Sequence, residues 1–534
     1  MADTDNKHRL ARSAAIVSTG NIISRVMGLV RDTAIAGVFG ASGAVSAYTI
    51  AFQVPRTLYE MLVGGMVSSA LVPTFGEYAD PERRRELGHI ASLLFTATGL
   101  ALVVVVLLLT LGAPLLTPLL VQFEDPALQT LTTSLLRIVA VGILFLGLSG
   151  MVTALAQSLQ RFVLPAFTTA VFNASIVAFA LILGPRWQDV RVLALGMVVG
   201  TVLQVALQLP ALRGVRLRPR LDLGHPVVRQ VIKLYAPVIF SLVISSLQVL
   251  VDRNLASRTG PSSPTWMALA TTLRETPLGL VSMAVSTAIL PTLSGLTAKE
   301  QDTDREHESK NGSEPFLATL AGGLRLVLTL TLPAATGLWV LSRPLIALLY
   351  QHGAFTPADS AQTALALRHY VLGMVFAAVD LPLVIALYAR KDTLRPALVG
   401  VASIVLYLAL ALPTYRQWGM VGLIAADNLK QAGHALIMVW LLGRTVGSLR
   451  GQGIGETLLK TGLASAVMGV AVYGTTVGLG TVLPTGGKLA WAATVGAGGL
   501  VGLFVYLGLC ALLRVRELET LRGLVGRVTS RSGS

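Results

Sequence analysis

A stripe of polar and charged residues lies on one face of the apolar segment 14–39. At ~100° per residue of an α-helix, its members fall within a sector of about 120°. The stripe consists of Asn21, Ser24, Arg25, Gly28, Arg31 and Asp32. Two arginines with one carboxylate leave a net positive charge, which favours an anion-binding cavity, because guanidinium groups recognise anionic oxygens in bidentate fashion. Snorkelling or a structural Arg31–Asp32 ion pair is the alternative.

The next apolar segment, 45–72, repeats the pattern. Gln53, Arg56, Glu60 and Gly64 share one helical face. Arg56 and Glu60 stand at positions i and i+4, where opposite charges attract. The pair either joins an anion-binding face or neutralises itself.

Charged residues also interrupt the later apolar segments. A charge within a spanning helix is costly, so each is a functional-site hypothesis. The residues are Arg137, Arg274 and Glu275 before Pro277, Asp380, and the group Asp427, Lys430, Gln431 and His434. The last group shares one helical face, which favours either a path for protons or ions or a satisfied structural network. Arg137 has no assignable partner, and His352 is predicted to be a solvated residue of a short external loop.

No pattern indicates enzyme chemistry. The sequence has no phosphate-cradling glycine loop, nucleophile elbow or paired His/Glu metal motif. The lone cysteine, Cys510, forms no intrachain disulfide and is expected to be a small core residue. We therefore expect no catalytic residues, no metal site and no cofactor, with coupling to a monovalent cation or to the membrane potential left open.

The elements that must position these residues are membrane helices. Of 534 residues, 53% are hydrophobic and 13% charged, with a mean hydropathy of +0.70, whereas a soluble domain carries about 25% charged residues. Apolar runs approach the ~20 residues of a spanning helix and do not alternate as barrel strands do. The predicted fold is an all-α polytopic membrane protein.

We predict about fourteen transmembrane helices. Their approximate bounds are 14–39, 45–72, 90–112, 131–157, 163–184, 191–212, 231–256, 266–294, 317–341, 361–388, 396–413, 418–442, 457–480 and 489–513. With both termini in the cytoplasm, most Lys and Arg fall in cytoplasmic segments, as the positive-inside rule predicts. The net charge of +15 is therefore assigned to lipid headgroups, with no nucleic acid partner.

A weak internal duplication divides the chain. Segment 71–75 recurs as 290–293, 117–120 as 343–346, and Arg161 with Pro165 as Arg390 with Pro396. The repeat unit has six predicted helices, so both copies have the same orientation, as in transporters whose lobes rock about a central site. The predicted domains are a cytoplasmic N-terminus 1–13, an N-terminal lobe 14–220, a C-terminal lobe 221–445 with a mobile cytoplasmic linker 297–315, two helices in 446–513 and a basic cytoplasmic tail 514–534.

Several motifs occur in the same order in a known family. The first comprises Gly20, Asn21, Ser24, Arg25, Gly28, Arg31 and Asp32, followed by Phe39, Gly40 and Ala41. Others are 52–55, 71–73, 161–167 with Asn173, 204–210, 251–253, 350–356 and 388–392 followed by Pro396. With these motifs, residues 14–445 resemble the MurJ/MviN family of lipid II flippases, within the multidrug/oligosaccharidyl-lipid/polysaccharide exporter superfamily.

The resemblance implies a central cavity whose arginines hold a lipid-linked diphosphate. The substrate-binding residues would be Arg25, Arg31, Asp32, Ser24, Asn21, Arg56, Glu60 and Arg274. The family commonly has an acid where Ser46 stands and arginines where Tyr59 and Thr272 stand. Family members can bind sodium, and Asp252 resembles one ligand, although segment 396–413 has no Asn or Asp. The ion-coupling candidates are Asp252, Asp380, Asp427 and Lys430.

The resemblance thus implies a flippase that moves lipid II across the bacterial cytoplasmic membrane by alternating access, in cell-wall synthesis. Its partners would be the polyprenyl-diphosphate-linked glycan, membrane lipids and cell-wall enzymes, with the polyprenyl tail in a groove made by the last two spans. The alternatives are an exporter of another polyprenyl-linked oligosaccharide, or a non-transporting membrane scaffold for cell-wall synthesis.

Overall fold

The computed structural model describes residues 2–60, 70–222, 224–303, 313–483 and 487–518. Every regular element in these ranges is a helix, which confirms the predicted all-α fold. The chain forms two compact units. The first is Met1–Thr265 with His352–Thr356, and the second is Trp266–Gln351 with Pro357–Ser534.

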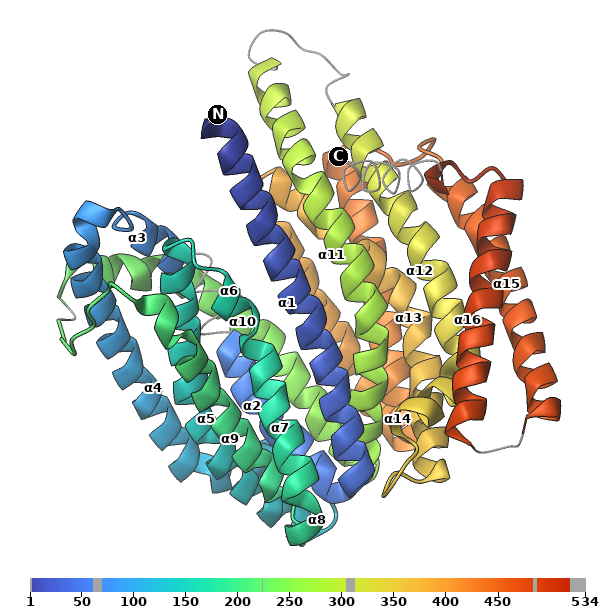
Figure 1. Cartoon of the computed structure of the whole chain (residues 1–534). Helices are drawn as coiled ribbons and strands as arrows, with labels where there is room; N and C mark the ends of the chain where they lie inside the picture. Colours follow the sequence, from blue (N-terminus) through green and yellow to red (C-terminus); the bar gives the residue numbers. More distant parts are fainter. Residues whose placement is uncertain (1, 61–69, 223, 304–312, 484–486, 519–534) are drawn as a thin grey trace. The chain divides into compact units, whose positions relative to one another are not determined.

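The first unit is built around one central helix, α5 (Pro126–Ser158) (Figure 1). Its other helices are α1 (Ala2–Phe39), α2 (Gly43–Tyr59), α3 (Val72–Gly76), α4 (Arg84–Leu120), α6 (Val163–Ala166), α7 (Thr168–Ile182), α8 (Gly184–Trp187), α9 (Arg191–Gln208) and α10 (Pro226–Ser257). Helices α2, α4 and α9 all pack against α5. In the most apolar window of α5, 67% of residues are buried, against 11% in α4, so α5 is a core helix and α4 an outer one.

Local signals in the sequence set the ends of these helices. Ser42 caps α2 by accepting a hydrogen bond from the Val45 amide, and Asp125 caps α5 in the same way, ahead of Pro126 at the first turn. Helix α1 ends at Gly40, whose φ of +64° favours glycine. A side chain there would also lie 2.6 Å from the Ala354 carbonyl oxygen.

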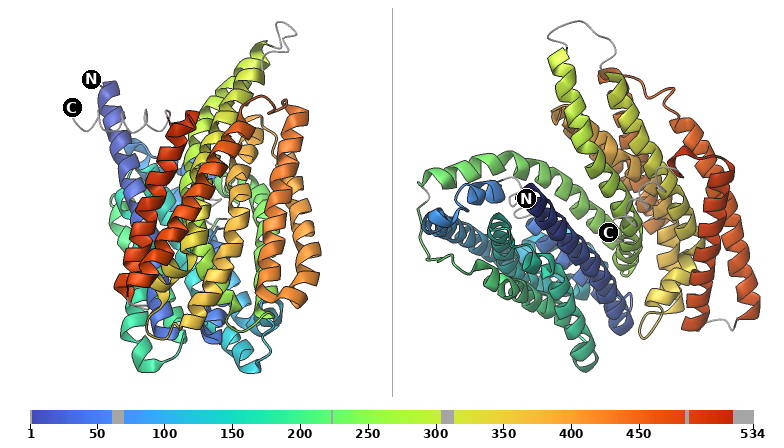
Figure 2. Two further views of the ribbon diagram at one scale, coloured as in Figure 1. Left: turned by 90° about the vertical axis from the view of Figure 1, so that its right-hand side faces the viewer. Right: turned by 45° about the horizontal axis from the view of Figure 1, so that its top comes forward.

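Six long helices of the second unit lie in the ranges that the structure describes. They are α11 (Ser263–Thr303), which begins at the end of the first unit, α12 (Ser313–Tyr350), α13 (Pro357–Ala389), α14 (Leu394–Thr445), α15 (Ile454–Val482) and α16 (Lys488–Leu512). Helices α15 and α16 run side by side and both pack on α12 (Figure 2).

Helix α14 is a pair of helices that meet at Gly419. Its 52 residues would extend about 78 Å, far beyond the ~30 Å hydrocarbon core of a bilayer. Gly419 has non-helical angles, with φ 57° and ψ −135°. The Thr414 hydroxyl donates to the Gly422 carbonyl at 3.1 Å, which a continuous helix forbids. The two halves match the predicted spans 396–413 and 418–442.

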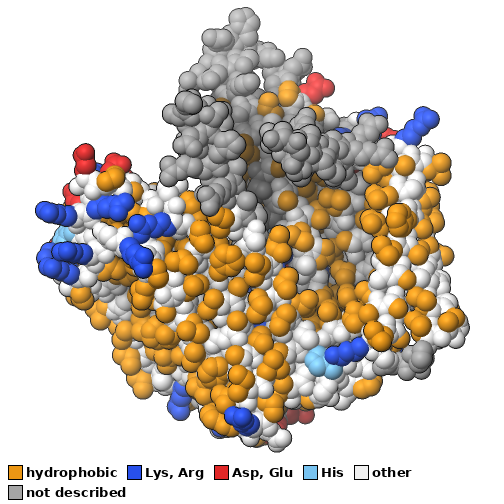
Figure 3. Space-filling model, viewed as in Figure 1, with side chains coloured by type: hydrophobic (Ala, Val, Ile, Leu, Met, Phe, Trp, Pro, Cys, Tyr) orange, Lys and Arg blue, Asp and Glu red, His pale blue; other side chains and the backbone are white. Residues whose placement is uncertain are grey.

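Nine helices in the described ranges are long and apolar enough to cross a membrane. The count of fourteen spans stays a prediction. Leu107, Leu111 and Leu115 of α4 are 54%, 77% and 79% exposed and stand one turn apart, so they form a stripe suited to lipid. Hydrophobic side chains cover the helices of the first unit, and Lys and Arg gather at the end that carries α3 (Figure 3).

One predicted span is wrong. Segment 163–184 is not one helix, because it breaks into α6, α7 and α8; α7 is an apolar helix of 15 residues. The described ends of the predicted linker 297–315 are helical, since α11 continues to Thr303 and α12 begins at Ser313; residues 304–312 lie outside the described ranges. Helix α1 begins at Ala2, within the predicted cytoplasmic N-terminus 1–13. The linker and the cytoplasmic N-terminus stay predictions.

The compact units and the predicted lobes divide the chain differently. Helix α10 belongs to the first unit, whereas the internal repeat assigned residues 221–445 to one lobe. The repeat describes similarity within the sequence, whereas the units are defined by contacts between residues. The predicted lobes therefore stay a prediction.

Candidate functional site

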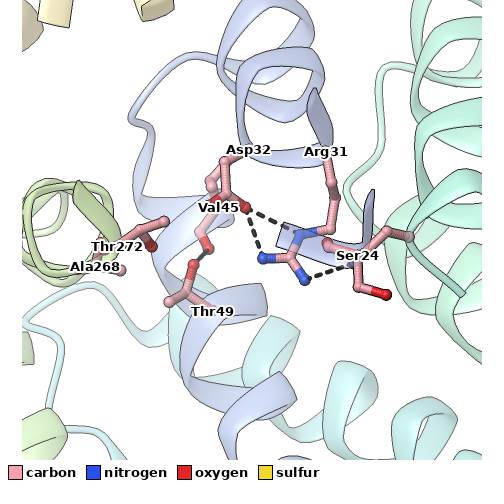
Figure 4. A network of polar contacts seen from close by, with 8 residues as sticks. Ser24, Arg31, Asp32, Val45, Thr49, Ala268 and Thr272 are labelled. Carbon is pink, nitrogen blue, oxygen red and sulfur yellow. Dashed lines mark hydrogen bonds and ion pairs between the residues drawn. The ribbon is translucent and has the colours of Figure 1, made fainter. Parts of the chain in front are cut away.

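Arg31 is the best-held residue of the α1 stripe. Its Nε and Nη2 lie 2.9 and 2.7 Å from Oδ1 of Asp32 (Figure 4). Its Nη1 donates to Oδ1 of Asn173 on α7 at 3.1 Å, and its guanidinium lies 5.6 Å from the centre of the Phe52 ring on α2. Three helices of the first unit therefore fix this guanidinium, with 22% of the side chain exposed.

The rest of the stripe is more open. Asn21 and Arg25 are exposed and Ser24 is half-buried. The Ser24 carbonyl accepts a weak hydrogen bond from Nδ2 of Asn173, at 3.4 Å. The stripe thus has an exposed part near Arg25 and a packed part near Arg31.

Asn173 is a site residue that the sequence analysis quoted within a motif but did not assign a role. It bonds both Arg31 and the backbone of Ser24. The available signal was its position: a single amide in the otherwise strongly apolar helix α7, where a polar side chain needs a partner.

Arg56 and Glu60 form the expected i, i+4 ion pair, with 3.0 Å between Nε and Oε1. Their side chains are 55% and 58% exposed. Gly64 lies outside the described residues, and so does the side chain of Tyr59. In this structure the charges of Arg56 and Glu60 neutralise each other, and the role of the pair in binding stays a prediction.

Ser46 and Thr272, where the family commonly has charged residues, are held by neutral hydrogen bonds. The Ser46 hydroxyl is fully buried and lies 2.8 Å from the Thr265 hydroxyl. Thr272 donates to the carbonyl of Ala268 in its own helix at 3.1 Å.

The second unit contains a buried basic cluster. Asp427 of α14 accepts from Nη1 of Arg274 on α11 at 3.2 Å and from Nζ of Lys430 at 2.6 Å. Arg274 lies 4.9 Å from the Tyr370 ring centre, and Lys430 lies 5.8 Å from that of Tyr407. Two cations share one carboxylate, so this cluster has a formal charge of +1 in a site where the Arg274 side chain is only 9% exposed.

Asp380 of α13 pairs with His434 of α14, with 2.6 Å between Oδ1 and Nδ1. Lys430 and His434 stand one turn apart on the face of α14 that the sequence predicts to be polar. The structure thus places Arg274, Asp427 and Lys430 in one network and Asp380 with His434 in a second, both in the same unit. Glu275 is exposed.

The other predicted residues lie outside these networks. Asp252 of α10 is half-buried beside Arg253. Arg137 of α5 has a partner, since its Nε donates to the Thr110 carbonyl of α4 at 3.3 Å. His352 is half-buried rather than a fully solvated loop residue, because its ring packs against Gly37 of α1. Within the described ranges, no group of three or more His, Cys, Asp or Glu could hold a metal ion.

An apolar groove of about 290 Å³ lies on the second unit between α12, α15 and α16. Its walls include Pro333, Leu341, Val472, Gly502 and Leu507. Cys510 also lines it and is buried, as expected for a small core residue.

The chain is similar to known membrane transporters. The family model described as "Lipid II flippase MurJ" matches residues 35–481. A "Probable lipid II flippase MurJ" of Vibrio cholerae is 31% identical over 95% of this chain and 97% of that protein. A "Lipid II flippase MurJ" of Burkholderia cenocepacia is 29% identical over 74% and 76%.

Solved structures share the fold. One described as "Lipid II flippase MurJ, inward closed conformation" has a TM-score of 0.76 at 23% identity, covering 94% of this chain and 99% of that one. An inward-facing multidrug transporter of the MATE family, in the MOP superfamily, has a TM-score of 0.60 at 11% identity over 81% of this chain and 95% of that one.

Proposed function

Because this chain belongs to the lipid II flippase MurJ family, we propose that it moves lipid II across the cytoplasmic membrane by alternating access. The observation that carries this proposal is the full-length relation to the Vibrio cholerae protein, with 95% of one chain and 97% of the other aligned.

The diphosphate of the lipid is proposed to bind the arginines of α1. Arg31 is already oriented by Asp32, Asn173 and Phe52, so little conformational entropy remains to be lost on binding. Arg25 lies exposed nearly two turns earlier on the same face, and Asn21 and Ser24 add neutral donors. Charge-assisted hydrogen bonds from guanidinium groups to phosphate oxygens are strong and directional.

Arg56 with Glu60, and the basic cluster of the second unit with Arg274, are proposed as further contributors of positive charge. A net charge of +1 around Asp427 is stabilised by an approaching anion, because the surrounding protein screens it weakly. The polyprenyl tail is proposed to lie in the apolar groove between α12, α15 and α16, whose aliphatic walls match an isoprenoid chain.

The protein is a multi-pass membrane protein of a transporter family, and its translocation step needs no bond to be made or broken. We propose that both termini face the cytoplasm, that the exposed arginines near α3 face anionic headgroups, and that cell-wall enzymes receive the exported lipid. We also propose that transport is driven by an ion or by the membrane potential, acting on Asp252, Asp380, Asp427 or Lys430.

One observation keeps a second substrate under consideration. Ser46 replaces an acid that is common in the family, and it is satisfied by Thr265. Export of another polyprenyl-linked oligosaccharide would retain the arginine site while altering the contacts to the sugar–peptide head. A scaffold without transport activity would need neither the arginine site nor contacts to the sugar–peptide head.

The test is rescue of a bacterium depleted of its own lipid II flippase, with lipid II on the outer leaflet as the readout. The Arg25→Ala/Arg31→Ala variant should fail. A matched control, Arg186→Ala/Arg191→Ala, removes two exposed arginines of the same unit and should rescue. If the unaltered chain inserts but exposes no lipid II, the flippase proposal is wrong and the alternative substrates are favoured.

A further inference from the structure

An acid–histidine pair in the second unit has no role in the proposed diphosphate site. Asp380 and His434 come from α13 and α14, and only 20% and 13% of their side chains are exposed. Both groups can change charge. In a weakly solvated site, that change alters the electrostatic energy of every charged neighbour.

Three further charged groups of the second unit belong to the Asp427 cluster. Lys430 and Asp427 lie on the same face of α14 as His434, and Arg274 reaches Asp427 from α11. Arg274 and Lys430 carry two positive charges, and Asp427 and Asp380 carry two negative charges. Taken together, the Asp427 cluster and the Asp380–His434 pair are therefore formally neutral with a neutral His434 and have a charge of +1 when His434 is protonated.

We propose that the Asp380–His434 pair is a proton-binding site whose occupancy is coupled to binding of the anionic lipid substrate. The inference rests on the proposed function and deepens it by naming the coupled ion. Histidine is the side chain that ordinarily changes charge between pH 5 and 8. A metal-like cation is disfavoured, because hard cations need several oxygen ligands and this pair offers one carboxylate beside a ring nitrogen.

The contact between His434 and Asp380 indicates which ring nitrogen carries the hydrogen and which takes up the proton. Nδ1 of His434 faces the carboxylate at 2.6 Å, so the neutral ring carries its hydrogen on Nδ1 and donates it to Asp380. The proton is then taken up at Nε2, and the imidazolium keeps its ion pair with Asp380. The Asp380 carboxylate is a positioning group, which fixes the tautomer and stabilises the charged ring.

Coupling between the proton and an anion is reciprocal. If the anionic lipid binds more tightly when His434 is charged, its binding must draw a proton onto His434. For a single linked proton, the affinity for the lipid rises by at most about tenfold for each unit of falling pH, within the titration range.

The experiment measures lipid II affinity and proton uptake together, on the full chain in detergent. Lipid II is added in weak buffer containing a pH indicator, between pH 5.5 and 8. We expect affinity to rise as pH falls and up to one proton to be taken up per lipid bound. His434→Asn, whose amide occupies the place of Nδ1, should bind lipid II with little pH dependence and no uptake. The matched control is His369→Asn, since Nδ1 of the His369 ring bonds the Leu365 carbonyl of its own helix and the bond from Asn428 goes to the His369 backbone, which the substitution keeps.

Each outcome decides one point. No lipid II binding by the unaltered chain contradicts the proposed function itself. Binding that is independent of pH, or uptake that persists in His434→Asn, overturns the proton site while leaving the flippase intact. Should His434→Asn not fold, Asp380→Asn tests the same site, because loss of the carboxylate must shift the pH at which uptake occurs.

Discussion

The two units hold their charged residues in different ways. In the first unit, Arg31 pairs with its sequence neighbour Asp32, and neutral groups complete the site. In the second unit, Asp427 binds Lys430 on its own helix and Arg274 from a helix 153 residues away in sequence. A neighbouring pair can form in any helix, whereas the second cluster exists only in the folded protein. The ion pair of the first site is therefore local in the sequence, whereas that of the second depends on the packing of two helices.

The largest effect should follow loss of the carboxylate at the centre of the second cluster. Asp427→Ala leaves Arg274 and Lys430 as uncompensated buried charges, which typically costs about 3–5 kcal/mol. We expect a strongly reduced melting temperature in detergent. Asp189→Ala, which removes a more exposed carboxylate paired with Arg191, should change it little. If Asp427→Ala and Asp189→Ala had similar melting temperatures, the buried carboxylate would matter no more for stability than the exposed one. The contrast drawn here between the two units would then be wrong.

Loss of Arg31 should weaken binding and also lower stability, because it removes the ion-pair partner of Asp32, whose side chain is only 11% exposed. Arg31→Ala removes charge-assisted hydrogen bonds worth about 1.5–3 kcal/mol each, so lipid II affinity should fall by at least tenfold in a binding titration. Arg31→Lys keeps the charge but loses the fork of donors, and should retain part of the affinity. If both variants bind like the unaltered chain, Arg31 is a structural residue.

Asn173→Ala should have a smaller effect through Arg31. It removes the hydrogen bond that the charged Arg31 guanidinium donates to Asn173 and the weak one to the Ser24 carbonyl. Arg31 itself stays in place but is less firmly oriented, so lipid II affinity should fall several-fold. Ser175→Ala is the control, because Ser175 lies on the same helix and bonds the Gly196 carbonyl instead. Equal loss of affinity in both variants would show that only the packing of α7 matters.

Arg56→Ala should have the smallest effect. Its ion pair with Glu60 is more than half exposed, and such pairs contribute about 0.3–0.5 kcal/mol to stability. Melting should be unchanged, while lipid II affinity falls by less than in Arg31→Ala. A loss larger than that of Arg31→Ala would move the main binding site to α2.

The comparison also explains what could be predicted from the sequence. Apolar runs and the 3.6-residue period were sufficient for the helical fold and for the faces bearing Arg31 and Lys430, since both signals are local. The pairing of Arg274 with Asp427 and of Asp380 with His434 depends on how separate helices pack, which no local pattern encodes. His352 was misread for the same reason, because its contact with Gly37 joins distant parts of the chain.

The most direct test of the central claim is lipid II translocation by the purified chain in proteoliposomes. Lipid II that reaches the outer leaflet is labelled by a reagent confined to the outside, and the rate is compared with that of the Arg25→Ala/Arg31→Ala variant. The account predicts protein-dependent labelling that the variant loses although it reconstitutes to the same level. Labelling at the same rate in protein-free vesicles, or in the variant, would contradict it.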